Sequence, residues 1–213
     1  MKLKKAKPIY IPFPRFIRHW METTAIGILF RSWLTQAFFY MTPLEKITKV
    51  CLTIVYFGGF WLIFAKIGGT SMSVGRLVAV FIITHTVSWL FSGQFLVTMT
   101  YLGYQTSPEK MQRYIRWLES VCRNRRFLKD VLLYGSLVRG TISATSDLDV
   151  RVISGSGRAD KFLAVLFTNF LRLHSFFMGI PLDVFLFDRD EQLARMNPKE
   201  RPISLCHGDL KSR

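Results

Sequence analysis

The chain has 213 residues, of which 29 are lysine or arginine and 14 are aspartate or glutamate, so its formal net charge is +15. Half of its residues are hydrophobic and its mean hydropathy is positive. High positive charge combined with high hydrophobicity argues against a soluble nucleic-acid-binding protein and favours a membrane protein with a basic cytoplasmic face.

The N-terminal segment, residues 1–47, is basic and rich in aromatic residues. Three prolines between positions 8 and 14 exclude a long regular helix at its start. From Arg18 to Met41 the segment becomes apolar, but Glu22 and Arg31 interrupt it. We interpret it as an interfacial amphipathic helix lying on anionic lipids. A third membrane span over residues 19–44 is the alternative.

Residues 48–106 contain two long stretches with few charged side chains. The first, Val50 to Ala65, has sixteen uncharged residues between Lys49 and Lys66. The second runs from Leu77 to Pro108, 32 residues without Asp, Glu, Lys or Arg. These lengths predict a transmembrane helical hairpin, whose flanking lysines can reach the membrane surface. A buried hairpin in a soluble domain is the alternative interpretation.

The distribution of basic residues predicts the orientation of this hairpin. The loop from Ile67 to Arg76 carries Arg76 as its only charged residue, whereas lysines and arginines crowd both outer flanks of the hairpin. By the positive-inside rule, both termini lie in the cytoplasm and the hairpin lies in the plasma (inner) membrane.

A helix is predicted to begin at Ser107-Pro108-Glu109, which offers an N-cap residue, a proline at the first position and an early acid. Apolar residues then recur at helical spacing and predict the face that packs on a sheet. These are Met111, Tyr114, Ile115, Leu118, Val121 and Cys122, with Arg113, Arg116 and Arg123 on the outward face.

The next element is an apolar run, Val131 to Tyr134, that predicts a buried strand ending at Gly135. Because glycine has no Cβ, a polyphosphate could approach the backbone there, and the amide of Ser136 could point at its oxygens. Arg139 and Gly140 follow in the same turn, which we expect to lead into a short helix.

Ten residues separate Ser136 from Asp147, where the chain enters a second predicted strand. Residues two apart on a strand face the same side, so Asp147 and Asp149 project together while Leu148 and Val150 enter the core. Two neighbouring carboxylates repel each other unless a cation lies between them, and Mg²⁺ held by carboxylates and substrate phosphates is usual in phosphoryl-transfer sites.

A third carboxylate is expected if the site uses two metal ions. A helix is predicted from about Ala159 to His174, followed by a strand over residues 181–187. Asp183 shares one face of that strand with Phe185 and Phe187 and is the stronger candidate. Asp188, at the other end of the strand, is the rival.

With its glycine-serine pair, Asp147-Leu148-Asp149 and the later Asp183, the chain from about 108 to 200 resembles a minimal catalytic domain of the DNA polymerase beta-like nucleotidyltransferase superfamily. The resemblance implies an α/β (α+β) fold with a small mixed sheet. It also implies transfer of a nucleoside monophosphate from an NTP to a hydroxyl or phosphate, with release of pyrophosphate.

The resemblance also implies roles for these positions. Gly135 and Ser136 would hold the triphosphate, and the three carboxylates would bind Mg²⁺ or Mn²⁺, with Asp183 helping to deprotonate the acceptor. Arg139 would either neutralise phosphate charge or pair with an acid of the fold. Arg151, on the same strand face as Asp149, could serve either role.

We expect a catalytic domain over residues 107–200 and a polar tail over 201–213. The predicted function is a membrane-anchored nucleotidyltransferase that acts on a lipid-linked sugar, a phospholipid precursor or a surface-polysaccharide intermediate. The alternatives are a protein-adenylylating or defence-type nucleotidyltransferase and a membrane scaffold that senses NTP without turnover. An acid triad argues against the scaffold, since a pure binding protein does not need all three acids.

The expected partners are NTP and anionic membrane lipids, whereas nucleic acid is disfavoured beside two spans. Because the catalytic domain is small, a homo-oligomer or a partner enzyme could complete the base pocket. The three cysteines, Cys51, Cys122 and Cys206, are scattered and predict free thiols. His85 is interpreted as a polar residue in helix packing, and Cys206-His207 as part of an unstructured tail.

Overall fold

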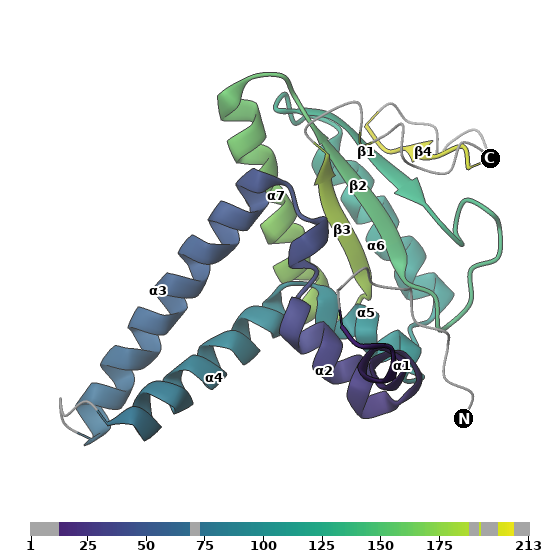
Figure 1. The fold of residues 1–213 in the computed structure, drawn as a ribbon. Helices are drawn as coiled ribbons and strands as arrows, with labels where there is room; N and C mark the ends of the chain where they lie inside the picture. The colour runs from purple at the N-terminus through teal and green to yellow at the C-terminus, as the bar shows by residue number, and fades with distance from the viewer. Residues whose placement is uncertain (1–12, 69–72, 188–191, 193–199, 207–213) are drawn as a thin grey trace.

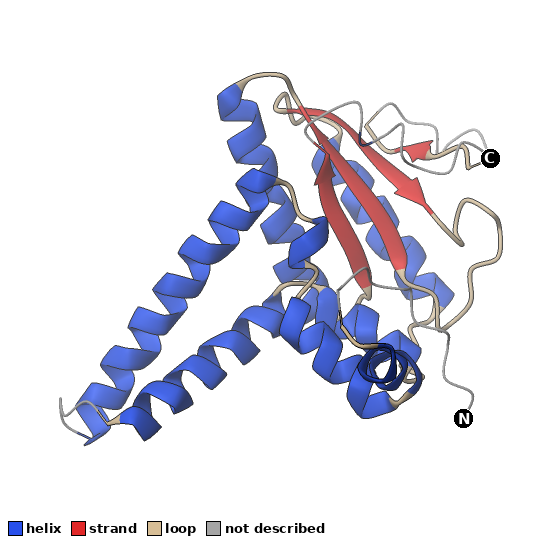
Figure 2. Ribbon diagram, viewed as in Figure 1, coloured by secondary structure: helices blue, strands red, loops and turns tan. Residues whose placement is uncertain are grey.

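The structure, a computed structural model, describes residues 13–68, 73–187, 192 and 200–206 (Figures 1 and 2). The described elements run α1 (Arg15–Thr23), α2 (Ala25–Thr35), η1 (Phe38–Tyr40), α3 (Pro43–Gly68), α4 (Val74–Phe91), α5 (Gln94–Tyr101), α6 (Pro108–Cys122), β1 (Leu128–Tyr134), β2 (Leu148–Ser154), α7 (Arg158–Phe177), β3 (Leu182–Phe187) and β4 (Ile203–Ser204).

The four described strands form one mixed sheet in the order β3-β2-β1-β4. Strand β1 pairs antiparallel with β2 and with β4, whereas β2 and β3 are parallel and are connected through α7. The mixed α/β sheet expected from the sequence is therefore confirmed, as are strands close to residues 131–134 and 181–187 and a helix over 159–174.

One face of the sheet forms the main hydrophobic core. Helices α6 and α7 lie against this face, and the alternate strand residues that point toward them are almost fully buried (Figure 1). On α6 the expected apolar residues from Tyr114 to Cys122 lie inside or at the edge of this core, and Met111 is also fully buried, while Arg113, Arg116 and Arg123 are exposed. The helix begins as expected, because the Ser107 hydroxyl accepts a hydrogen bond from the amide of Lys110.

The other face of the sheet is mixed in character. Strand β2 presents Asp149 and Arg151 on it, and β3 presents Asp183 and Phe185, following the period of two along each strand. The core-facing positions are aliphatic, so they anchor the strands while the opposite positions remain available for polar side chains. Chemistry on this sheet is therefore confined to one face.

Helices α3 and α4 form a hairpin that extends away from the sheet (Figure 1). By length and composition both are apolar enough to cross a membrane, with mean hydropathies of 1.9 over Pro43–Ile67 and 1.6 over Val74–Phe91. In their most apolar windows, none of the α3 residues and only 22% of the α4 residues are buried within the protein. Most of their apolar surface therefore faces outward.

A buried ion pair joins the start of α3 to helix α7 and the sheet. The Arg172 guanidinium of α7 donates to Glu45 Oε1 at 2.8 Å and to the carbonyl of Val184 on β3 at 2.9 Å. The Glu45 side chain is fully buried and its other oxygen accepts from the amide of Thr42. Because both charges are paired away from water, this contact fixes the hairpin on the domain.

The N-terminal region departs from the single interfacial helix expected over residues 18–41. Its helical part divides into α1 and α2, because Thr24 is extended and its hydroxyl caps α2 by accepting from the Gly27 amide. Helix α2 then ends at Gln36 and Ala37, which both have positive φ. Rather than lying alone, α2 packs against α4 and α5.

The second charge-free stretch also differs from the continuous segment expected from the sequence. Helix α4 ends at Phe91, and Gly93, with a φ of +78°, turns the chain into the separate helix α5. Glycine adopts this left-handed conformation without the penalty that a side chain imposes. Helix α5 contacts β3 as well as α2, so it lies beside the sheet although it was grouped with the hairpin in residues 48–106.

The segment expected to be a polar tail contributes to the sheet in its described part. Residues Ile203 and Ser204 form β4 beside β1, and Leu205 is fully buried in the core. The Ser204 hydroxyl donates to Asp130 at 2.9 Å. Two residues are too few to give a recognisable strand pattern in the sequence.

Candidate active site

Three carboxylates meet at the edge shared by β2 and β3. Asp147 precedes β2, and Asp149 lies directly opposite Asp183 in the parallel register of the two strands. One oxygen from each of the three acids lies within 4.8 Å of the others. The structure thus brings together all three acids that the sequence pattern selected, while the rival Asp188 lies outside the described residues.

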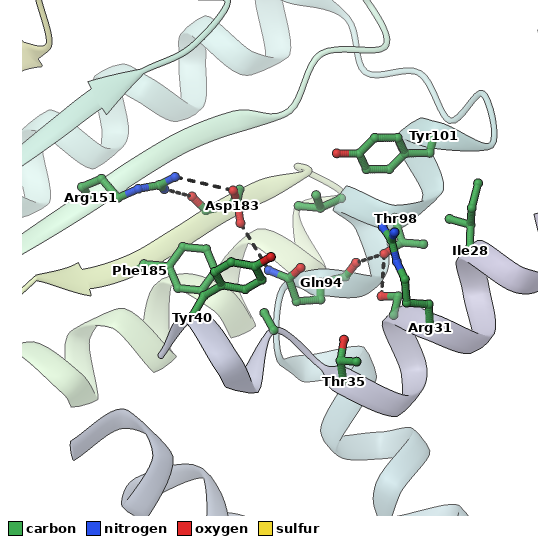
Figure 3. A pocket seen from close by; sticks show the side chains of 13 residues that line it. Ile28, Arg31, Thr35, Tyr40, Gln94, Thr98, Tyr101, Arg151, Asp183 and Phe185 are labelled. Carbon is green, nitrogen blue, oxygen red and sulfur yellow. Dashed lines mark hydrogen bonds and ion pairs between the residues drawn. The ribbon is translucent and has the colours of Figure 1, made fainter. Parts of the chain in front are cut away.

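Arg151 holds two of these acids from the same strand face. Its guanidinium lies 3.5 Å from Asp149 Oδ1. It also lies 3.7 Å from Asp183 Oδ2 and donates to the Asp183 carbonyl at 2.8 Å (Figure 3). It also lies over the ring of Phe185, 5.3 Å from the centroid. The positive charge of Arg151 therefore offsets the repulsion between the carboxylates.

A further contact to the acids comes from outside the sheet. Gln94, the first residue of α5, donates from Nε2 to Asp183 Oδ1 at 3.3 Å (Figure 3). Sequence reasoning did not select Gln94, because it lies in an apolar stretch without a motif. Its signal was the Ser92-Gly93 pair, which breaks the helix and lets a polar side chain begin a new one beside the site.

The glycine-serine turn lies against the same acids. Gly135 follows β1 with a φ of +78°, and a Cβ at this position would lie 2.3 Å from Asp149 Oδ2. The short helix expected after Ser136 is wrong: the turn closes through bonds from the Arg139 amide to the Gly135 carbonyl and from the Thr141 amide to the Ser136 carbonyl. Gly140, with a φ of +68°, redirects the chain before a helix can form.

Ser136 provides an unused polar atom at this turn. Its hydroxyl oxygen is buried without a hydrogen-bond partner among the residues that the structure describes. Buried polar atoms are usually paired, so an unpaired hydroxyl beside a glycine turn fits a site that accepts a ligand oxygen. The triphosphate-binding role expected for Gly135 and Ser136 is compatible with this arrangement and stays a prediction.

Arg139 lies farther out in this turn. Its guanidinium pairs with Glu200, and its side chain is 53% exposed. Of the two interpretations left open by the sequence, pairing with an acid of the fold is the one that the described contacts display.

The donor set of the three acids fits a hard divalent cation. Carboxylate oxygens are the ligands that Mg²⁺ and Mn²⁺ prefer, and Mg²⁺ is commonly held by one or two carboxylates together with substrate phosphates. The absence of a side chain at Gly135 leaves Asp149 unobstructed on the side of the turn. The residues present therefore suit Mg²⁺ or Mn²⁺.

A cavity of about 420 Å³ opens beside Asp183, between β3 and helices α2 and α5 (Figure 3). Asp183 and Arg151 form one wall. The remaining lining residues are Ile28, Arg31, Ser32, Thr35, Ala37, Tyr40, Gln94, Val97, Thr98, Tyr101 and Phe185.

The other polar residues noted in the sequence lie away from this edge. All three cysteines are free, and the Cys206 thiol lies 3.8 Å from the carbonyl of Cys122. His85 bonds through Nε2 to the Trp33 carbonyl at 2.8 Å, as expected of a residue in helix packing. His207 lies outside the described residues.

Comparison with known families gave one match. Residues 115–210 match the family model described as "Nucleotidyltransferase domain". The matched range contains the three acids, the glycine-serine turn and all four described strands, whereas α1 to α5 precede it. Comparison with curated proteins gave no match.

Proposed function

We propose that the protein is a membrane-anchored, metal-dependent enzyme that transfers a nucleoside monophosphate from an NTP to a membrane-associated acceptor, as the match of residues 115–210 to the nucleotidyltransferase family model supports. The observation that carries this proposal is the convergence of Asp147, Asp149 and Asp183, with their oxygens within 4.8 Å, beside a glycine turn. A family match alone identifies a domain, whereas this geometry supplies what the reaction requires.

Each part of the site has a chemical task in this reaction. The three carboxylates would hold Mg²⁺ or Mn²⁺, which when bound would neutralise charge on the triphosphate and activate the attacking hydroxyl. The acceptor oxygen bonds to the α-phosphorus, the bond to the bridging oxygen breaks, and pyrophosphate leaves. Asp183 takes up the proton of the acceptor hydroxyl.

The positions of these groups indicate from which side each substrate would approach. Gly135 and Ser136 follow β1, Asp147 directly precedes the inner strand β2, Asp149 lies on β2, and Asp183 lies on β3 beyond it. A triphosphate at the turn therefore approaches from the β1 side. In-line displacement requires the attacking hydroxyl on the opposite side of the phosphorus, which is the side of Asp183.

The membrane part of the proposal is supported by the exposed apolar surface of α3 and α4 and by the charge pattern. A helix whose most apolar window is 0% buried by its own protein needs another apolar environment. Lysines and arginines flank the hairpin on the side of the proposed catalytic domain, and by the positive-inside rule this supports a cytoplasmic location for that domain. Anionic lipids would then contact the basic surface.

Pyrophosphate release from each NTP, with Mg²⁺ or Mn²⁺, tests the proposal. Detergent-solubilised protein would be assayed with and without native membrane lipids, beside an Asp147→Ala/Asp149→Ala control. We expect release that requires both acids and increases with lipid. If pyrophosphate release requires the acids but does not increase with lipid, and the nucleotide label is transferred to a protein, the result would favour the protein-adenylylating alternative. Nucleotide binding without turnover would favour the sensing scaffold, and no binding would contradict the site itself.

A further inference from the structure

We propose that the cavity between α2, α5 and β3 binds the acceptor, and that the acceptor is a small hydroxyl-bearing phosphate ester. This inference rests on the proposed function and adds to it the place and the chemical class of the second substrate. The cavity has a volume of about 420 Å³ and includes Asp183 in its wall. That volume lies within the usual range for small-molecule sites and suits a headgroup or a phosphorylated sugar.

The position of the cavity fits the direction of the reaction. It adjoins Asp183 and Arg151 (Figure 3). It therefore lies at the β3 side of the acids, whereas Gly135 follows β1 on the other side of β2. A hydroxyl at its inner end would therefore meet the carboxylate that accepts its proton. The rest of the acceptor would extend between α2 and α5.

The cavity has a wall fixed by hydrogen bonds before any ligand enters. Thr98 donates to Ser32 Oγ at 2.6 Å or to the Gln94 carbonyl at 2.7 Å, and Trp89 Nε1 donates to Ser32 Oγ at 3.0 Å. Gln94 in turn donates to Asp183. Helices α2 and α5 are thus held to each other and to the catalytic acid, so little ordering remains to be done on binding.

Arg31 determines the charge of the ligand. It lies on α2 in the lining of the cavity, on the wall opposite the acids (Figure 3). Burial lowers the pKa of its guanidinium, while Glu22, Tyr101 and Tyr40 act in the opposite direction. A partly desolvated guanidinium favours an oxyanion that it can bind through two parallel hydrogen bonds, as it does with phosphate.

Most of the residues that line the cavity lie outside the range that matches the family model. Of the lining residues, Arg151, Asp183 and Phe185 belong to the matched range 115–210, and the others belong to the N-terminal part of the chain. The matched range thus supplies the proposed catalytic acid, and the helices that precede this range supply most of the cavity lining. Such a division is expected when an added segment selects the acceptor.

The phosphate ester could come from a phospholipid headgroup or from a soluble phosphorylated polyol, and binding measurements distinguish the two. Full-length protein in nanodiscs without anionic lipid would be titrated with glycerol 3-phosphate, with glycerol as the uncharged control. In a second arm, nanodiscs would contain phosphatidylglycerol, with diacylglycerol as the control. No NTP is added, so the result does not depend on turnover.

Substitutions of Arg31 test the assignment. Arg31→Gln is expected to weaken binding of the anionic probe by about tenfold or more, because one charge-assisted contact is lost. Arg31→Lys should restore part of the affinity, which shows that a loss in Arg31→Gln is not misfolding. Arg15→Gln, at an exposed arginine on the neighbouring α1, is the matched control and should leave binding unchanged.

Kinetics provide a second readout. With the acceptor that binds, Arg31→Gln should raise KM for the acceptor and leave KM for the NTP unchanged. The inference is overturned if neither anionic probe binds the wild type more tightly than its uncharged control, or if Arg31→Gln binds as well as the wild type. Binding that depends on Arg31, without pyrophosphate release from any NTP, would sustain the cavity and refute the proposed function.

Discussion

Alanine at Gly135, compared with alanine at Gly140 in the same turn, distinguishes a loss of backbone stability from a change in the position of Asp149. A methyl group at Gly135 would lie 2.3 Å from Asp149 Oδ2, whereas at Gly140 it would meet nothing within 4 Å. Both glycines have positive φ, +78° and +68°. Each alanine should therefore cost about 1–2 kcal/mol of stability, but only Gly135→Ala forces a catalytic carboxylate to move.

The size of the displacement sets the expected loss of activity. Ordinary contact requires at least 3.4 Å, so Asp149 Oδ2 must move by about 1 Å from its 2.3 Å approach. Because the Asp149 carboxylate can be displaced by rotation about its side-chain bonds, the fold should survive while the proposed metal ligand is misplaced. A displacement of this size costs about a hundredfold in rate.

The assay is single-turnover pyrophosphate release at saturating NTP and Mg²⁺, together with chemical unfolding of both variants in detergent. We expect equal losses of stability, a rate about a hundredfold lower for Gly135→Ala, and a rate close to wild type for Gly140→Ala. Equal rates in the two variants would refute the reasoning, because the contact with Asp149 would then have no consequence.

Three further predictions concern the neighbours of the site. Glu45→Gln should lower the free energy of unfolding by about 3–5 kcal/mol, because it leaves Arg172 charged and buried, whereas Glu45→Leu/Arg172→Leu should cost far less; chemical unfolding of both decides this. Gln94→Leu should lower kcat about tenfold with an unchanged KM for NTP, as a lost contact to Asp183 predicts, and an unchanged kcat would contradict it. Asp183→Asn should raise the Mg²⁺ concentration needed for half-maximal nucleotide-dependent activity. If the variant has the same Mg²⁺ dependence as the wild type, the role of Asp183 as a ligand is contradicted.

The acids were predictable from the sequence because their signals are local. Asp147 and Asp149 stand two apart at the start of an apolar strand, so the period of two alone places them on one side. Asp183 stands out as an acid on an otherwise apolar strand face. Their meeting point follows from the parallel pairing of β2 and β3, which the intervening helix favours.

The cavity was not predictable, because it depends on contacts between distant segments. Arg31 was treated as an interruption of an apolar stretch, yet this interruption marks a side chain that lines the cavity. Gln94 and Glu45 likewise lie in segments whose hydrophobicity dominates any pattern. Their partners, Asp183 and Arg172, are 89 and 127 residues away along the chain, and periodicity carries no information over such separations.

The attachment of the hairpin at both of its ends fixes how far the enzyme can reach. Helix α4 ends at Phe91, and three residues later Gln94 donates a hydrogen bond to Asp183. Three residues span at most about 11 Å, while the headgroup layer on each side of a bilayer is about 5–8 Å thick. At the other end, Glu45 of α3 is bonded to Arg172 of the domain.

With α3 and α4 in a bilayer, the active site has a set height and cannot swing on a tether. It would work within or just above the headgroups and meet acceptors that diffuse in two dimensions along the surface. Residues inserted between Phe91 and Gln94 would lift the carboxylates away from that layer, so the length of this junction is itself a determinant of which acceptors the enzyme encounters.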